Sequence, residues 1–270
     1  MANKREKTRA PKPRTPSQHT KTVLLFLLIA LLCTGAFAAS YLCSLDIASK
    51  LDPQKIYGVA QSTLVYDKDG NVAANIHGTE DRVWLSLDQI PENMKNAVIA
   101  AEDVRFYSHN GVDIKRIFGA LWQDLKAGSL DQGASTLTQQ LIKNITADND
   151  YSVKRKVNEI FRAFALEKEI DDKDRILVMY LNTIYLGYNS YGVQTAAMQY
   201  FDKDVSQLDL AESAVLAGLT NNPSIYDVYN HPEKVKERQE TILAQMLDQK
   251  MISQEEYEAA VAEKLNYRPY

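Results

Sequence analysis

Two short polar blocks lie close together in this sequence, and both hold side chains that could do chemistry. Residues 101–111 contain an acidic pair and a histidine, and residues 133–144 contain a run of Ser, Thr and Gln followed by Lys and Asn. A solvated helix face usually carries Lys and Glu instead, whereas hydroxyl and amide side chains offer hydrogen bonds of defined geometry. The mixture is typical of a site that holds many hydroxyl groups with a carboxylate in reach.

Glu102 is the candidate base of the first block. It ends an apolar helical stretch, with Val98 and Ile99 one turn before it. A carboxylate there is partly desolvated, which makes it a better base at neutral pH than a fully solvated helix-end acid. Asp103 points about 100° away on a helix, so the two acids need not share a role. His109 begins a His-Asn-Gly segment, which favours a loop that hydrogen-bonds its own backbone over a general acid.

The second block places a polar cluster at the start of a predicted helix. Its members are Ser135, Thr136, Thr138, Gln139 and Gln140. The free N–H groups of a helix start favour anions. Thr136 with Gln139 three positions on resembles a capping box. Simple N-capping would explain Ser135 or Thr136, but it would not explain two successive glutamines.

A third candidate is Glu159, which follows Arg155 and Lys156 at spacings that put all three on one helical face. One interpretation is a surface salt-bridge ladder, which would stabilise the helix by roughly a few tenths of a kcal/mol. The other is a carboxylate within a cationic patch that binds a polyanion, with Lys143 joining it. Spacing alone does not decide between them.

The elements that carry these residues follow a long apolar segment. Residues 1–21 form a basic, proline-containing tail that we expect to be disordered, and residues 22–45 carry no charge. About 20 apolar residues span a bilayer as a helix, and the positive-inside rule places the tail in the cytoplasm and the body outside. A cleaved signal peptide is the alternative, because Ala36-Phe37-Ala38 fits a cleavage site. We favour a retained anchor, because the basic and apolar regions are both long.

The body, residues 46–270, is predicted to be mainly helical. Residues 46–60 are a juxtamembrane connector, and residues 62–67 and 71–77 flank a turn in a small β-hairpin. One helix is expected from Pro91 onward. The others are expected at 114–127, 136–145, 152–170, 173–186, 191–200, 206–219, 232–250 and 253–265, with Ser206 and Ser253 as N-caps.

Composition excludes several classes of function. The net charge is −4, so nothing in the body favours nucleic acid as a partner. The two cysteines lack a partner at metal-ligand spacing and the four histidines are scattered, so we predict no metal-ligating residues.

The polar blocks, in this order, resemble the peptidoglycan glycosyltransferase domain of glycosyltransferase family 51. The similarity covers residues 61–246, and its motifs are Glu102-Asp103-x-x-Phe106-x-x-His109-x-Gly111, Gly133-x-Ser135-Thr136-x-Thr138-Gln139-Gln140 with Lys143-Asn144, Arg155-Lys156-x-x-Glu159, and Ile176-Leu177-x-x-Tyr180-Leu181-Asn182 with Tyr185-x-Gly187. A fifth stretch runs from Tyr191-Gly192-Val193 to Tyr200-Phe201 and from Ala211-Glu212-x-Ala214 to Pro223-Ser224. Five ordered motifs of this composition are far more specific than any one of them.

The resemblance implies a mainly α, lysozyme-like domain over residues 61–270 with a membrane-embedded jaw, and polymerisation of lipid II into glycan strands. Glu102 would be the base for the acceptor hydroxyl, and Glu159 would position the acceptor or a divalent cation, Mg²⁺ or Mn²⁺, near the diphosphate. The implied substrate-binding residues are Asp103, Phe106, His109, Ser135, Thr136, Thr138, Gln139, Gln140, Lys143, Asn144, Arg155 and Lys156. The implied partners are lipid II, the growing strand, the bilayer, and transpeptidases and other cell-wall assembly proteins.

The chain departs from the family pattern at two places. Tyr151 stands where members usually carry an Arg, and Leu219-Thr-Asn-Asn-Pro-Ser224 replaces a common Leu-Pro-Lys-Ala-Pro-Ser stretch in a loop to which we assign less weight. Neither Ser-x-x-Lys nor Lys-Thr-Gly occurs, so we expect a monofunctional transglycosylase. The alternatives are a catalytically weakened scaffold for wall assembly, supported by Tyr151, and a lysozyme-like muramidase, which would have no diphosphate to hold.

Overall fold

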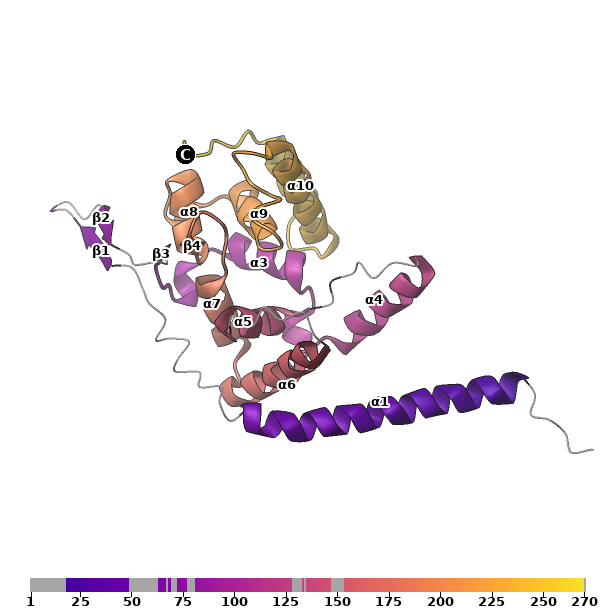
Figure 1. Cartoon of the computed structure of the whole chain (residues 1–270). Helices are drawn as coiled ribbons and strands as arrows, with labels where there is room; N and C mark the ends of the chain where they lie inside the picture. Colours follow the sequence, from indigo (N-terminus) through magenta and orange to yellow (C-terminus); the bar gives the residue numbers. More distant parts are fainter. Residues whose placement is uncertain are drawn as a thin grey trace, which may run out of the picture. The chain divides into compact units, whose positions relative to one another are not determined.

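The apolar N-terminal segment forms one long helix, α1 (Gln18–Ala48) (Figure 1). Within it, Lys21–Tyr41 is a stretch of 21 residues with a mean hydropathy of 2.5, long and apolar enough to cross a membrane. The structure is a computed structural model that describes residues 18–48, 63–66, 68, 72–76, 81–127, 133, 135–146 and 153–269. Residues 1–17 of the predicted tail, residues 49–60 of the connector and Tyr151 lie outside the described residues.

The chain divides into two compact units, residues 1–45 and residues 46–270. In the second unit, β1 (Thr63–Tyr66) and β2 (Val72–Ile76) pair antiparallel, with Thr63 opposite Ile76, so the predicted hairpin is confirmed. A second pair was not predicted: β3 (Asp81–Arg82) lies parallel to β4 (Ser190–Tyr191).

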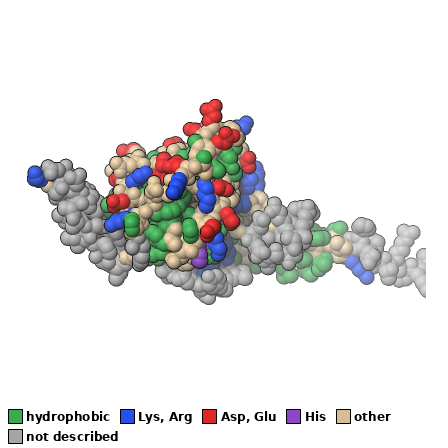
Figure 2. Space-filling view, turned by 90° about the horizontal axis from the view of Figure 1, so that it is seen from above, with side chains coloured by type: hydrophobic (Ala, Val, Ile, Leu, Met, Phe, Trp, Pro, Cys, Tyr) green, Lys and Arg blue, Asp and Glu red, His purple; other side chains and the backbone are tan. Residues whose placement is uncertain are grey.

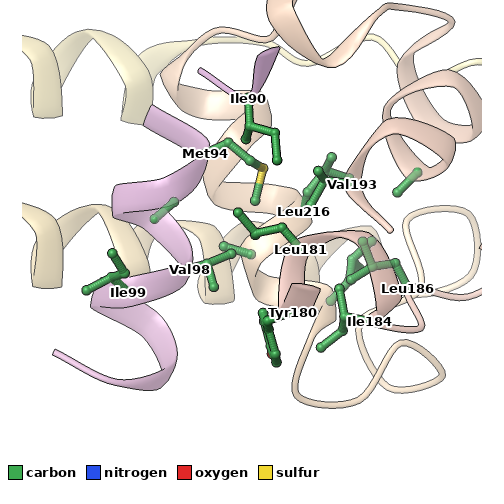
Figure 3. Close-up of a cluster of buried hydrophobic side chains, with 14 of the residues drawn as sticks. Ile90, Met94, Val98, Ile99, Tyr180, Leu181, Ile184, Leu186, Val193 and Leu216 are labelled. Atoms are coloured by element: carbon green, nitrogen blue, oxygen red, sulfur yellow. The ribbon is translucent and has the colours of Figure 1, made fainter. Parts of the chain in front are cut away.

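One mainly apolar helix of this unit has almost no exposed face. Every residue from Ala211 to Leu219 of α9 (Leu210–Leu219) is buried. It packs between α3 (Glu92–Glu102) and α10 (Pro232–Asp248). A helix that is buried on every side is stable only when other elements surround it, and its polar Glu212 and Ser213 side chains are hydrogen-bonded. Figure 3 shows the same core, where Ile90, Met94 and Val98 lie on the side of α3 toward the following labelled residues: Tyr180, Leu181, Ile184, Leu186, Val193 and Leu216.

A second layer of helices carries the polar motifs. Helix α5 (Leu137–Thr146) packs against α6 (Val153–Ile170) and α7 (Lys173–Thr183). The remaining elements are α4 (Ile114–Ala127), α8 (Val193–Phe201), α11 (Gln254–Ala262) and the short helices η1 (Leu87–Gln89), η2 (Phe106–Ser108) and η3 (Val205–Gln207). The prediction of a mainly α fold is confirmed. Figure 2 shows acidic and basic side chains interspersed on one face of the described residues.

Three of the boundaries that differ from the sequence prediction have a local cause. Ser206 is not an N-cap: the Asp204 side chain caps η3, and α9 begins only after Asp209, whose carboxylate accepts from the Glu212 N–H at 2.8 Å. Helix α7 ends at Thr183 because the backbone becomes extended at Ile184. Helix α8 begins after Gly192, which has φ +84° and approaches the Asn182 backbone so closely that a Cβ would lie 2.8 Å from its carbonyl oxygen.

Candidate functional site

Glu102 is the last residue of α3, and its carboxylate is held by two neutral donors. The Nε2 of Gln140, on α5, donates to Oε2 at 2.7 Å, and the hydroxyl of Thr220, just after α9, donates to Oε1 at 2.5 Å. The side chain lies in a cavity wall and the residue is only 7% exposed. Three elements that are distant in sequence therefore fix the orientation of one carboxylate.

Gln140 is itself fixed by a buried tyrosine. The Tyr180 hydroxyl, from α7, donates to the Gln140 Oε1 at 3.0 Å. Burial, and then the negative charges of Glu102 and Asp103, raise the pKa of Tyr180 well above its usual value. Tyr180 is therefore a neutral donor at physiological pH, and it orients the amide so that Nε2 faces Glu102.

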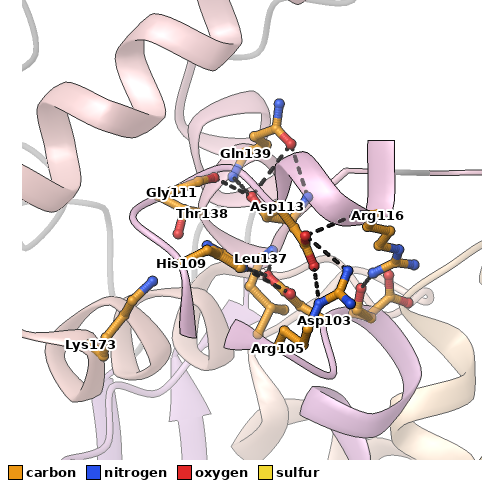
Figure 4. Close-up of polar contacts among 12 residues, drawn as sticks. Asp103, Arg105, His109, Gly111, Asp113, Arg116, Leu137, Thr138, Gln139 and Lys173 are labelled. Atoms are coloured by element: carbon orange, nitrogen blue, oxygen red, sulfur yellow. Dashed lines mark hydrogen bonds and ion pairs between the residues drawn. The ribbon is translucent and has the colours of Figure 1, made fainter. Parts of the chain in front are cut away.

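Asp103 occupies a separate environment behind the wall of the cavity. Its carboxylate is fully buried and accepts hydrogen bonds from the Leu137 N–H and from His109 Nε2, each at 3.0 Å (Figure 4). Because Leu137 is the first residue of α5, this carboxylate satisfies a free N–H at a helix N-terminus and complements the helix dipole there. The two adjacent acids thus have different surroundings, and His109 bonds the Asp103 carboxylate rather than its own backbone.

Four more residues that the sequence placed among the substrate-binding candidates make structural contacts around the start of α5 or in the core. Thr136 and Gln139 form the predicted capping box, since Gln139 N–H donates to Thr136 Oγ1 and Thr136 N–H donates to Gln139 Oε1. Thr138 donates to Glu167, and Phe106 is buried in the core. These contacts tie α5 to the surrounding helices, and they show that the capping box accounts for Gln139 whereas Gln140 reaches the carboxylate.

A glycine brings the loop of the first motif against α6. Gly111 has φ +87°, and its carbonyl accepts from the Thr136 hydroxyl at 2.6 Å. A Cβ on Gly111 would lie 2.8 Å from the backbone C and O of Ala163. Both the left-handed conformation and this close approach require the residue without a side chain.

An arginine pair surrounds Asp113 on the other side of this loop. Arg105 donates to both Asp113 oxygens at 2.8 and 2.9 Å, and the Arg116 N–H donates to Oδ1. Burial alone raises the pKa of Asp113, but these hydrogen bonds and the Arg105 charge outweigh it and hold the pKa below its usual value. The Arg116 guanidinium also donates to the Glu102 backbone carbonyl.

Ligand atoms of Asp103, His109 and Asp113 lie within 4.8 Å of one another, which is close enough to consider a metal ion. Both carboxylates are already engaged, however: Asp113 by Arg105, and Asp103 by His109 and the Leu137 N–H. Two guanidinium groups beside the cluster would also repel a cation. We interpret the group as a structural hydrogen-bond network.

The third motif provides the cationic end of the cavity. Arg155 donates to Glu159 Oε2 at 2.7 Å, while Lys156 bonds Oε1 and also donates to the Ser135 hydroxyl at 2.7 Å. The residue Glu159 is 5% exposed. Because Glu159 is buried, these contacts do not form an exposed salt-bridge ladder. They link α6 to the start of the second motif and orient the cations along the cavity.

One cavity of about 580 Å³ collects most of the predicted site residues. Those in its lining are Glu102, Ser135, Gln139, Gln140, Lys143, Asn144, Arg155, Lys156 and Glu159. Those outside its lining are Asp103, Phe106, His109, Thr136 and Thr138. The cavity thus joins a carboxylate, an amide and several cations in a single space, and the second group forms its supporting layer.

The lining also includes residues that were not among the predicted site residues. They are Ala101, Arg116, Gly133, Ile184, Tyr185, Thr220, Asn221, Pro223, Arg238 and Gln245. The loop from residue 219 to 224 was assigned little weight because it departs from the family pattern, yet Thr220 donates to Glu102. Its position directly after the most apolar helix of the body was the available signal, because such a helix ends inside the domain.

A cavity lined by a carboxylate, amides and cations can bind hydroxyl groups and negative charge. A family model described as Transglycosylase matches residues 69–247. The chain therefore belongs to the transglycosylase family, and the prediction of an enzyme of this class is confirmed.

Known proteins with similar sequences carry penicillin-binding names. Penicillin-binding protein 1A of Clostridium perfringens is 40% identical over 278 residues, covering 96% of this chain and 33% of that protein. Penicillin-binding protein 2D of Bacillus subtilis is 40% identical over 249 residues, covering 92% and 36%. The crystal structure of penicillin-binding protein 1A from Haemophilus influenzae aligns with a TM-score of 0.44 and 25% identity, covering 78% of this chain and 22% of that one. The chain spans about a third of the length of the two curated relatives.

Proposed function

We propose that this chain polymerises lipid II into glycan strands, with Glu102 as the general base. The observation that carries the proposal is a desolvated carboxylate, held by neutral donors, in one cavity with Lys143, Arg155 and Lys156. A base and a cationic patch in the same space suit a reaction that deprotonates a sugar hydroxyl and releases a diphosphate.

In the proposed reaction the acceptor is the 4-hydroxyl of a GlcNAc. Its proton passes to Glu102 as its oxygen forms a bond to the anomeric carbon of the donor MurNAc. The bond from that carbon to the diphosphate oxygen breaks on the opposite face, and the electron pair leaves with undecaprenyl diphosphate. Attack opposite to the leaving group inverts the anomeric centre. Gln140 and Thr220 support this step because they fix both oxygens of Glu102.

The leaving diphosphate requires positive charge. Arg155 and Lys156 are oriented by Glu159 and Ser135, and Lys143 exposes its side chain in the cavity lining. Cations that are oriented before the reaction stabilise developing charge without reorganising. Glu159 acts here as the group that orients the cations.

A divalent cation near the diphosphate was the other role expected for Glu159. The donor set fits this poorly, because both Glu159 oxygens already bond Arg155 and Lys156. Mg²⁺ and Mn²⁺ prefer carboxylate oxygens that are available for coordination. We therefore assign charge neutralisation to the side-chain cations.

We further propose that α1 anchors the protein in the membrane, with the basic tail in the cytoplasm and the catalytic unit outside. The apolar stretch Lys21–Tyr41 and the positive charge before it support this topology. Lipid-linked donors lie in the bilayer, so an anchored enzyme stays close to them. We propose transpeptidases and other wall-assembly proteins as partners, because an anchored enzyme would work at the same membrane surface as they do.

The test is polymerisation of labelled lipid II by detergent-solubilised protein, comparing the wild type with Glu102→Gln. We expect glycan ladders from the wild type and a loss of at least a hundredfold in the variant, because general-base catalysis contributes about 10² to 10⁴ in rate. The matched control is Glu169→Gln, which changes an exposed glutamate on α6 and should keep wild-type activity.

Three results would contradict the proposal. Wild-type turnover by Glu102→Gln would remove the base assignment. Release of muropeptides from preformed cell wall, without ladders from lipid II, would instead indicate a muramidase. No ladder from a folded wild-type protein would favour the scaffold alternative.

A further inference from the structure

Thr220 is placed so that its hydroxyl can serve two acceptors. Its Oγ1 lies 2.5 Å from Glu102 Oε1 and 2.7 Å from the carbonyl oxygen of Ala217. A hydroxyl has one hydrogen to donate and two lone pairs that accept. It can therefore donate to only one of these oxygens at a time, and rotation about its C–O bond moves the hydrogen between them.

The partner on the other carboxylate oxygen lacks this freedom. Gln140 presents an amide Nε2 to Glu102 Oε2, and an amide nitrogen can only donate. Tyr180 donates to the opposite end of the same amide, which opposes a flip. Gln140 therefore suits an ionised Glu102, and a proton on Oε2 would face an N–H group.

A base in a catalytic cycle must be accommodated in both of its protonation states. The Thr220 hydroxyl meets that requirement at Oε1. When Glu102 is ionised, the Thr220 hydroxyl donates to Oε1. When Glu102 is protonated on Oε1, the Thr220 hydroxyl donates to the Ala217 carbonyl and accepts from the Oε1 hydroxyl.

We propose that Thr220 is a positioning residue that keeps Glu102 hydrogen-bonded in both protonation states and directs the acceptor's proton to Oε1. This inference rests on the proposed role of Glu102 as base. In the forward step the proton moves from the acceptor hydroxyl to Oε1 while the Thr220 hydrogen turns to Ala217. When Glu102 releases the proton to solvent, the hydrogen returns, so Thr220 is unchanged overall.

The experiment compares Thr220→Val, which keeps the shape and removes the hydroxyl, with Thr220→Ser, which keeps the hydroxyl. The matched control is Thr241→Val, because Thr241 is exposed and its hydroxyl donates to the Glu237 carbonyl at 2.8 Å. Initial rates of lipid II polymerisation are measured against pH for all four proteins. Loss of a donor to a carboxylate favours its protonated form, so the acid limb of the Thr220→Val profile should move up by about one pH unit. We also expect kcat to fall about tenfold with little change in KM.

A second readout does not depend on turnover. Carbon-13 NMR of protein labelled at Glu carboxyl groups reports the titration of Glu102, whose signal is assigned by its absence in Glu102→Gln. Its midpoint should lie higher in Thr220→Val than in the wild type and in Thr220→Ser. Equal midpoints, or equal impairment of the Val and Ser variants, would overturn the role of Thr220. An absence of polymer from every protein, with the midpoints shifted as expected, would instead overturn the proposed function and leave the Thr220 contact intact.

Discussion

Replacing Asp103 with alanine tests whether the supporting layer behind the cavity is structural. Asp103 is fully buried and accepts from the Leu137 N–H and from His109. The other ring nitrogen of His109 is buried and has no hydrogen-bond partner among the described residues. Asp103→Ala therefore leaves two buried donors without an acceptor and removes a charge from the start of α5.

The magnitude follows from these losses. Each buried donor left unsatisfied costs about 1–3 kcal/mol, and a favourable charge at a helix N-terminus contributes about 0.3–1 kcal/mol. We expect the free energy of unfolding to fall by about 3–5 kcal/mol. In a domain of this size that lowers Tm by roughly 10 °C. Asp103→Asn should lose less, because its amide oxygen can still accept from Leu137.

The assay is thermal unfolding of the detergent-solubilised protein, followed by circular dichroism, with lipid II polymerisation measured well below the transition. Asp248→Ala, an exposed change at the last residue of α10, is the control and should leave Tm within about 2 °C of the wild type. An unchanged Tm for Asp103→Ala together with a raised KM for lipid II would refute the reasoning, because Asp103 would then contact substrate.

Two further predictions concern the loop that contacts α6 and the missing arginine. Gly111→Ala places a Cβ 2.8 Å from the Ala163 backbone at φ +87°. We expect the free energy of unfolding, measured with urea, to fall by about 3 kcal/mol. A loss below about 1 kcal/mol would show that α6 can move away from the new methyl group. Tyr151→Arg should raise the affinity for the lipid II donor several-fold by adding a cation for the diphosphate, measured as KM; an unchanged KM would mean that another cation already fills that role.

Local patterns in the sequence predicted much of the fold. The α4 bounds, the hairpin and the Ser253 cap of α11 are determined by neighbouring residues, and the structure confirms each. Ser206 failed because two capping boxes compete within five residues, and the one at Asp209 starts the helix that is buried in the core. Propensity alone cannot rank two adequate caps when tertiary packing decides.

The site shows a similar division. Glu102 was recognisable from the unusual polar blocks around it, whereas the spacing of Arg155, Lys156 and Glu159 allowed both a surface salt-bridge ladder and a cationic patch. The sequence did not predict which residues line the cavity and which support it from behind. Glu102 and Asp103 are adjacent, and their side chains separate only because the chain turns after α3. Thr220 is 118 residues from Glu102, and no local pattern reports a pairing over that distance.

The distance in sequence between Glu102 and Thr220 also sets when the site can be completed during synthesis. A ribosome adds about 5–20 residues per second, so Thr220 is synthesised about 6–24 s after Glu102. Until then Glu102 lacks the hydroxyl that holds Oε1, and the emerging chain carries a carboxylate without its complete surroundings. Long-range closure of this kind is also slow compared with helix formation. Activity should therefore begin in a single late step, when the segment after α9 docks onto the end of α3, rather than increase gradually as the chain grows.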